Sequence, residues 1–173
     1  MRLYRYVGPA HLAEQAQSQI PRCQPGGPEE LSAWLTAEGY ALPVTLTYVV
    51  TADGRLRVSA RNSEHVTCAR GEPVRAAGEI GFRNSTGKPF VDFLTNQSTG
   101  YCPEPSCFGA AAEALVEAGF AAPPGFSHEF IFRRCPTCSG ISIVKEADFE
   151  CAACGSALPL GWNFDDTSRA AAV

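Results

Sequence analysis

Eight cysteines are spread along the chain, and four of them form two closely spaced pairs. Two residues separate Cys135 from Cys138, twelve residues follow, and Cys151 and Cys154 repeat the first spacing. This pattern is typical of a four-cysteine zinc ribbon, because each pair supplies two of the four thiolates that tetrahedral Zn²⁺ needs. The alternative interpretation of the same four residues is two redox-active dithiols or disulfides.

The residues around the cysteine pairs suit two tight turns joined by a hairpin. Pro136 and Gly140 are expected to shape the first turn and Gly155 the second, because glycine adopts positive φ at little cost. The alternating apolar residues at 141–144 favour a strand between the pairs. Four cysteine ligands leave no coordination position for water. The predicted Zn²⁺ cofactor is therefore structural: it stabilises the fold and takes no part in chemistry.

The remaining cysteines, Cys23, Cys68, Cys102 and Cys107, are expected to be free thiols. Cys102 and Cys107, together with His128 or Cys68, are an alternative second metal site, although their spacing is not that of a known knuckle. Cys102 is also a candidate nucleophile, because the N-terminus of a helix lowers a thiol pKa. Zinc-type cysteines, and a start without the apolar region of a secretory signal, favour a cytoplasmic protein.

The composition is that of a globular protein, with 173 residues of which 45% are hydrophobic and 18% charged. A net charge of −4 and a pI near 5.4 argue against a general affinity for nucleic acid. A nucleic-acid-binding ribbon would need Arg70, Arg75, Arg133 and Arg134 on one face. No apolar run approaches the roughly 18 residues that span a bilayer. We therefore expect a protein partner or a small-molecule ligand rather than nucleic acid or a membrane.

The periodicity of apolar residues predicts an α+β fold, with a twisted antiparallel sheet or half-barrel, about three helices and a C-terminal zinc ribbon. Expected strands cover residues 3–7, 44–50, 56–60, 74–82, 90–94 and 129–133, and expected helices cover 9–19, 28–39 and 106–118. The predicted buried face of the last helix consists of Phe108, Ala111, Ala112, Leu115 and Val116. The α+β body would span residues 1–126, the ribbon and a packing tail 127–165, and a loose C-terminus 166–173.

Two polar stretches, residues 61–65 and 96–103, follow expected strands and are candidates for a binding site. If the two stretches meet, they form a small polar cleft for a nucleotide, a sugar or a peptide backbone. His65 would act as a general acid or base, Tyr101 as a donor, and Glu79 or Glu64 as an orienting carboxylate. The other expected ligand-binding residues are Asn96, Gln97, Ser98 and Thr99. The alternative is that these side chains satisfy backbone groups of tight loops.

Part of this region resembles a known segment. Residues 65–80, HVTCARGEPVRAAGEI, are similar to a segment shared by bacterial polymorphic-toxin C-terminal modules and plant IQ-motif calmodulin-binding proteins. Those proteins carry a later Ser-Gly-His-Tyr-x-Pro loop. Here Ser98, Tyr101 and Pro103 match that loop, whereas Gly100 replaces its histidine. The likeness covers residues 60–104, and it implies a small enzyme of the toxin-module type.

Two functions are therefore predicted. The first is a zinc-stabilised cytosolic binding or adaptor protein that recognises a protein or a small polar ligand. The second is a small enzyme that acts on a nucleotide-containing or protein substrate through His65 and Tyr101. The closed four-cysteine site and the acidic charge favour the first.

Overall fold

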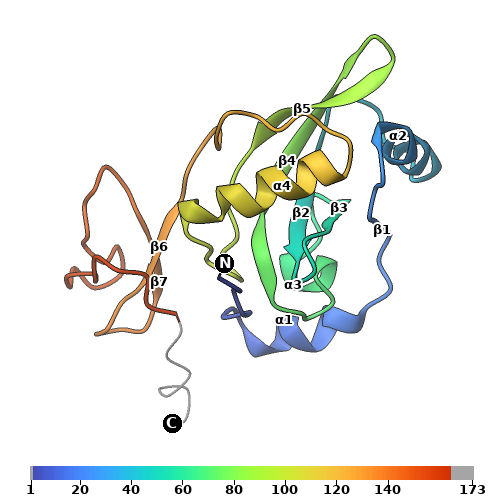
Figure 1. The fold of residues 1–173 in the computed structure, drawn as a ribbon. Helices are drawn as coiled ribbons and strands as arrows, with labels where there is room; N and C mark the ends of the chain where they lie inside the picture. Colours follow the sequence, from blue (N-terminus) through green and yellow to red (C-terminus); the bar gives the residue numbers. More distant parts are fainter. Residues whose placement is uncertain (1, 165–173) are drawn as a thin grey trace.

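The computed structural model describes residues 2–164 and shows an α+β fold, as the sequence predicts (Figure 1). An antiparallel five-stranded sheet packs with helices to form the body, and a two-stranded ribbon stands beside it. The C-terminus that we expected to be loose, residues 166–173, lies outside the described residues. None of the helices within residues 2–164 combines the length and hydropathy that a membrane span requires.

The sheet has the order β1-β3-β2-β4-β5, and every neighbouring pair is antiparallel. Its strands are β1 (Arg22–Cys23), β2 (Val44–Thr51), β3 (Leu56–Ala60), β4 (Val74–Ser85) and β5 (Lys88–Leu94). The strands expected at 44–50 and 56–60 pair as one hairpin, and those expected at 74–82 and 90–94 pair as another. The β4–β5 turn consists of Thr86 and Gly87, both with positive φ, as the two-residue turns that match strand twist require. The edge strand β1 is not among the strands that the sequence predicted.

The structure corrects three predictions about local elements near the N-terminus and in the first polar stretch. The expected strand at 3–7 reduces to a single bridge between Tyr4 and Val74. The first helix, α1 (Ala10–Glu14), ends early and continues as a 3₁₀ turn over Gln15–Gln17, whereas α2 (Pro28–Ala37) matches its prediction. His65, predicted at the end of a polar loop, instead begins the short helix α3 (His65–Cys68), which packs against β2 and β3.

The last helix of the body, α4 (Phe108–Glu117), contacts β2, β3 and β4 across the sheet (Figure 1). Its buried residues are Ala110, Ala111, Ala114 and Leu115. The predicted face was therefore partly wrong, since Val116 is 63% exposed. The helix is apolar on almost every side, so periodicity alone does not fix which side is buried. Small alanine side chains on the observed face let the helix backbone approach the sheet.

The ribbon, residues 131–158, contains β6 (Ile131–Arg134), β7 (Ile141–Val144) and the four paired cysteines. On the edge of the ribbon that faces away from β7, side-chain amides bind the backbone groups of two residues, Phe130 just before β6 and Arg134 at its end. Asn96 accepts a hydrogen bond from the Phe130 N–H at 2.7 Å and donates to the Phe130 carbonyl at 2.7 Å. Asn163 pairs in the same way with the N–H and carbonyl of Arg134, at 2.9 and 2.7 Å. Each asparagine side chain therefore forms the two backbone hydrogen bonds that a neighbouring strand would otherwise form.

A buried ion pair and the tail, residues 159–164, attach the ribbon to the body. The Arg133 guanidinium is almost fully buried, and it donates to Glu104 at 2.6 Å and to the Leu160 carbonyl at 2.7 Å. Trp162 donates its indole N–H to the Cys102 carbonyl at 2.7 Å and packs edge-on against Tyr4. These contacts hold the ribbon and the body in one arrangement. Breaking the ion pair or the indole hydrogen bond would leave a buried charge or polar group without a partner, which is costly.

Candidate functional site

The four paired cysteines lie close enough to bind one metal ion. All four sulfur atoms are within 4.8 Å of one another. Cys135 Sγ lies 3.6 Å from Cys154 Sγ, and Cys138 Sγ lies 3.6 Å from Cys151 Sγ. Each pair contributes one buried and one exposed cysteine, so the cluster lies at the surface of the ribbon. It is the one group of candidate metal ligands found within residues 2–164.

The two cysteine knuckles share a single backbone pattern. In the first, the Cys135 N–H donates to the Gly140 carbonyl and the Ser139 N–H donates to the Cys135 carbonyl, at 2.8 and 2.9 Å. In the second, Cys151 forms the equivalent two bonds with Ser156 and Gly155, both at 2.8 Å. The left-handed residue is Ser139 in the first knuckle, where we expected Gly140, and Gly155 in the second. Both knuckles therefore hold their thiols with the same type of turn.

Hydroxyl groups beside the cluster favour the thiolate forms of two of its members, Cys151 and Cys154. The Ser142 hydroxyl lies 3.5 Å from Cys151 Sγ, and this bond, with nearby backbone N–H groups, lowers the Cys151 pKa to about 6. The Ser156 hydroxyl, 3.4 Å from Cys154 Sγ, lowers the pKa of that thiol. Four thiolates so close together repel one another unless a cation is present. The cluster is therefore suited to hold a thiophilic cation.

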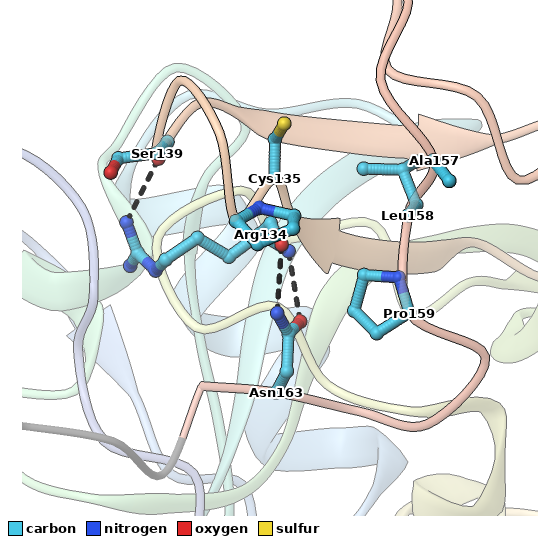
Figure 2. A pocket seen from close by; sticks show the side chains of 8 residues that line it. Arg134, Cys135, Ser139, Ala157, Leu158, Pro159 and Asn163 are labelled. Atoms are coloured by element: carbon cyan, nitrogen blue, oxygen red, sulfur yellow. Dashed lines mark hydrogen bonds between the residues drawn. The ribbon is translucent and has the colours of Figure 1, made fainter.

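A groove of about 410 Å³ lies between the first knuckle and the tail (Figure 2). Its lining residues are Arg134, Cys135, Pro136, Ser139, Ala157, Leu158, Pro159 and Asn163. The Arg134 side chain extends towards Ser139, donates to its carbonyl at 3.2 Å and lies over the Phe164 ring. Arg134 forms no ion pair within the described residues. The groove thus combines apolar walls with one cation that lacks a carboxylate partner.

The two polar stretches meet in a separate cavity of about 320 Å³. His65, Glu79, Gln97 and Thr99 all line it. His65 Nε2 lies 3.0 Å from the Gly78 carbonyl oxygen. Because a carbonyl only accepts, Nε2 carries the proton and Nδ1 is an acceptor. Glu79 forms an ion pair with Arg61 at 3.0 Å. The cavity can therefore offer hydrogen-bonding groups to a small polar molecule.

The other predicted site residues form hydrogen bonds within the fold. Tyr101 is fully buried, donates its hydroxyl to the Glu72 carbonyl at 2.8 Å, and does not line the cavity beside His65. Asn96 is fully buried, and its amide binds Phe130 and the Pro103 carbonyl. The Ser98 hydroxyl accepts the Tyr101 N–H at 3.3 Å. The structure therefore brings His65, Glu79, Gln97 and Thr99 together, but not Tyr101, Asn96 or Ser98.

The cysteines outside the cluster are unpaired and three of them are buried. Burial raises the pKa of Cys68 to about 11 and that of Cys102 and Cys107 to about 12. These thiols are therefore protonated near neutral pH, which disfavours Cys102 as a nucleophile.

The arginines that a nucleic-acid-binding face would need are not all available, because Arg133 is buried against Glu104.

We expect His65 to make the folded state less stable in acid. Burial lowers the folded-state pKa of His65 below its usual value near 6.5. As the pH falls through about 6.5, the unfolded chain binds a proton at this imidazole before the folded chain does, so the free energy of unfolding decreases. Urea unfolding between pH 7 and pH 5 measures this slope, which should be smaller in His65→Gln. His11→Gln, at an exposed position, is the matched control; an equal slope in all three proteins would contradict the prediction.

Comparison with family models, with curated proteins and with solved structures gives no match to this chain. The resemblance of residues 60–104 to toxin modules and IQ-motif proteins thus gains no support from these comparisons. The candidate site is therefore inferred from the geometry of this chain alone.

Sequence reasoning missed several residues that belong to these sites. Ser142 and Ser156 are placed next to thiols by the hairpin and the second knuckle, and only the position of Ser156 after a CxxC-Gly turn offered a signal. Asn163 gave none, because its partner Arg134 is 29 residues away in the chain. Side-chain amides that bind distant backbone groups leave no periodic trace in a sequence.

Proposed function

We propose that this chain is a zinc-stabilised binding protein of the cytosol, and that its ribbon recognises a partner protein. Sulfur atoms about 2.3 Å from a tetrahedral Zn²⁺ are about 3.8 Å apart, and two of the sulfur pairs here are 3.6 Å apart. All ligands would be cysteines, so Zn²⁺ would hold the knuckles together with no position left for a substrate. The eight unbridged cysteines support a reducing compartment.

The observation that carries the protein-binding proposal is the groove beside the first knuckle. Metal-held turns and the Asn163–Arg134 pair fix its walls, so a partner would meet a preformed surface. Leu160, next to the groove, is 76% exposed and extends the apolar surface. Because Asn163 already binds the N–H and carbonyl of Arg134, a partner would be recognised there through side chains.

The chemistry of the groove specifies its occupant. Pro136, Leu158 and Pro159 provide apolar contacts, and the Arg134 guanidinium provides a cation without an ion-pair partner in the described chain. An arginine in such a position favours a carboxylate, which it can bind through two parallel hydrogen bonds. The proposed partner is therefore a protein segment that places an acidic residue next to an apolar one.

We expect the full chain, loaded with Zn²⁺, to select such segments from a library of short random peptides displayed on phage. Selected peptides should be enriched in Asp or Glu beside aliphatic residues. Arg134→Gln should weaken binding of a selected peptide several-fold in fluorescence polarisation, because an exposed or half-buried ion pair contributes up to about 1 kcal/mol. Lys145→Gln removes a positive charge elsewhere on the ribbon and should leave affinity unchanged. Equal losses in the two variants, or no enrichment, would refute the proposal.

The polar cavity beside His65 is still a predicted small-ligand site. Its two loops do meet, but no contact in the described structure favours one class of ligand over another. Catalysis through both His65 and Tyr101 has no geometric support, because the Tyr101 hydroxyl binds the Glu72 carbonyl.

A further inference from the structure

A third cavity, of about 270 Å³, lies where the N-terminal segment, β4 and the start of α4 meet. Its lining includes Arg2, Tyr4, Arg75, Ser106 and Glu113. Two backbone hydrogen bonds between Tyr4 and Val74, at 2.7 and 2.9 Å, fix the N-terminal segment against β4. Two arginines that are distant in the sequence are thereby brought to one cavity.

Each guanidinium group is positioned by a contact that leaves other N–H groups free for a ligand. Arg75 donates its Nε–H to the Ala52 carbonyl at 2.9 Å, and its terminal nitrogen atoms are not used by that bond. Arg2 is stacked over the Trp162 ring, 4.5 Å from its centre, and stacking uses none of its N–H donors. Within residues 2–164 neither arginine forms an ion pair. The cavity therefore has two oriented cations without a bound carboxylate.

Two hydroxyl groups add hydrogen-bond donors to the same cavity. Tyr4 is only 1% exposed although it lines the cavity, and burial raises the pKa of its phenol. The phenol therefore keeps its proton at neutral pH. Ser106 also lines the cavity and brings a second hydroxyl to it. Two hydroxyls and two guanidinium groups form a donor-rich surface that suits the oxygen atoms of an anion.

Charge and size limit the ligand class. Arg2 and Arg75 contribute two positive charges to the lining and Glu113 one negative charge, so the cavity is net positive in a chain of net charge −4. Its volume lies below the roughly 300 Å³ at which pockets begin to hold drug-sized ligands. A small oxyanion fits both limits, and the planar fork of arginine matches phosphate oxygens well.

We propose that the cavity formed by Arg2, Tyr4, Arg75 and Ser106 binds a phosphate group, either as inorganic phosphate or as the head of a small phosphate monoester. This site is distinct from the ribbon groove, because the two linings share no residue.

Isothermal titration of the full chain with inorganic phosphate, and separately with glycerol 3-phosphate, tests the proposal at constant ionic strength. Arg75→Gln and Arg2→Gln should each weaken binding about tenfold or more. Arg5→Gln removes an exposed charge beside Tyr4 without changing the lining, and should leave affinity unchanged. Tighter binding of glycerol 3-phosphate would assign the site to monoesters, and tighter binding of inorganic phosphate would assign it to the free ion.

Glu113→Gln separates loss of the site from loss of the fold, because a misfolded variant would bind phosphate more weakly and not more tightly. Removing the opposing carboxylate should tighten phosphate binding several-fold, because a like charge no longer lies beside the anion. The proposal is overturned if the unaltered chain binds neither compound, if Arg75→Gln and Arg5→Gln bind equally well, or if Glu113→Gln leaves the affinity unchanged.

Discussion

Removal of the metal ion will unfold the ribbon and free the tail. The ribbon has two short strands, and its own buried apolar cluster contains little beyond Val144 and Leu158. A two-stranded hairpin with so small a core is not stable alone. Structural zinc sites in small domains supply binding free energies on the order of 10 kcal/mol, and this energy is also folding energy. We therefore expect one metal ion per chain and no folded ribbon without it.

Trp162 reports this transition directly. Its indole binds the Cys102 carbonyl and packs against Tyr4, so release of the tail moves it into water. In a Trp34→Phe background, a chelator should shift Trp162 emission to longer wavelength and make residues 131–158 sensitive to protease. Cys135→Ser should have the same effect and lose the metal, whereas Cys23→Ser should retain it. A metal-free chain with unchanged emission and protease resistance would contradict the structural role of the site.

Substitution of Asn96 is expected to destabilise the fold strongly, because its side chain is fully buried and fully hydrogen-bonded. Asn96→Ala would leave the Phe130 N–H, the Phe130 carbonyl and the Pro103 carbonyl without their partner. An unsatisfied buried group costs about 1 to 3 kcal/mol, so three such groups would cost about 3 to 9 kcal/mol. Because Phe130 is only partly buried, we expect a loss near the lower end of this range, about 3 to 5 kcal/mol in the free energy of unfolding. That is a large share of the roughly 5 to 15 kcal/mol that stabilises a typical domain.

Urea unfolding measures this loss, and two further variants sharpen it. Asn96→Asp replaces the amide donor with an acceptor that faces two carbonyl oxygens, so it should be at least as destabilising as alanine. Gln97→Ala alters the exposed neighbour and should change stability by no more than about 0.5 kcal/mol. A loss below about 1 kcal/mol for Asn96→Ala would show that the amide does not join the body to the ribbon as described.

The sequence predicts those parts of the molecule whose signals are local. The spacing of the paired cysteines, the turn residues of both hairpins and the proline that opens α2 all lie within a few residues of the elements they specify. The four-residue helix α3 is too short to show a helical period, and it was missed. In α4, apolar residues lie on almost every side of the helix, so the sequence does not identify the buried side. Val116 was therefore wrongly assigned to it.

Contacts between distant residues explain why the candidate sites could be predicted only in part. The loops that carry His65 and Thr99 do line one cavity. The sequence could not show that the Tyr101 hydroxyl binds the Glu72 carbonyl 29 residues away. It also could not show that Arg2 and Arg75 line one cavity, because that depends on a single backbone bridge. Polar residues in a loop look alike whether they bind a ligand or the chain itself.

The asparagine amides on the outer edge of β6 have a consequence for behaviour at high concentration. An open strand edge is a template on which a second chain can add its own strand, and such growth leads to self-association. Asn96 and Asn163 block that template at Phe130 and Arg134. Pro89 and a register shift interrupt the β5 edge of the large sheet in a similar way. Loss of the metal would unfold β6, expose its buried Phe132 and make the chain prone to aggregate.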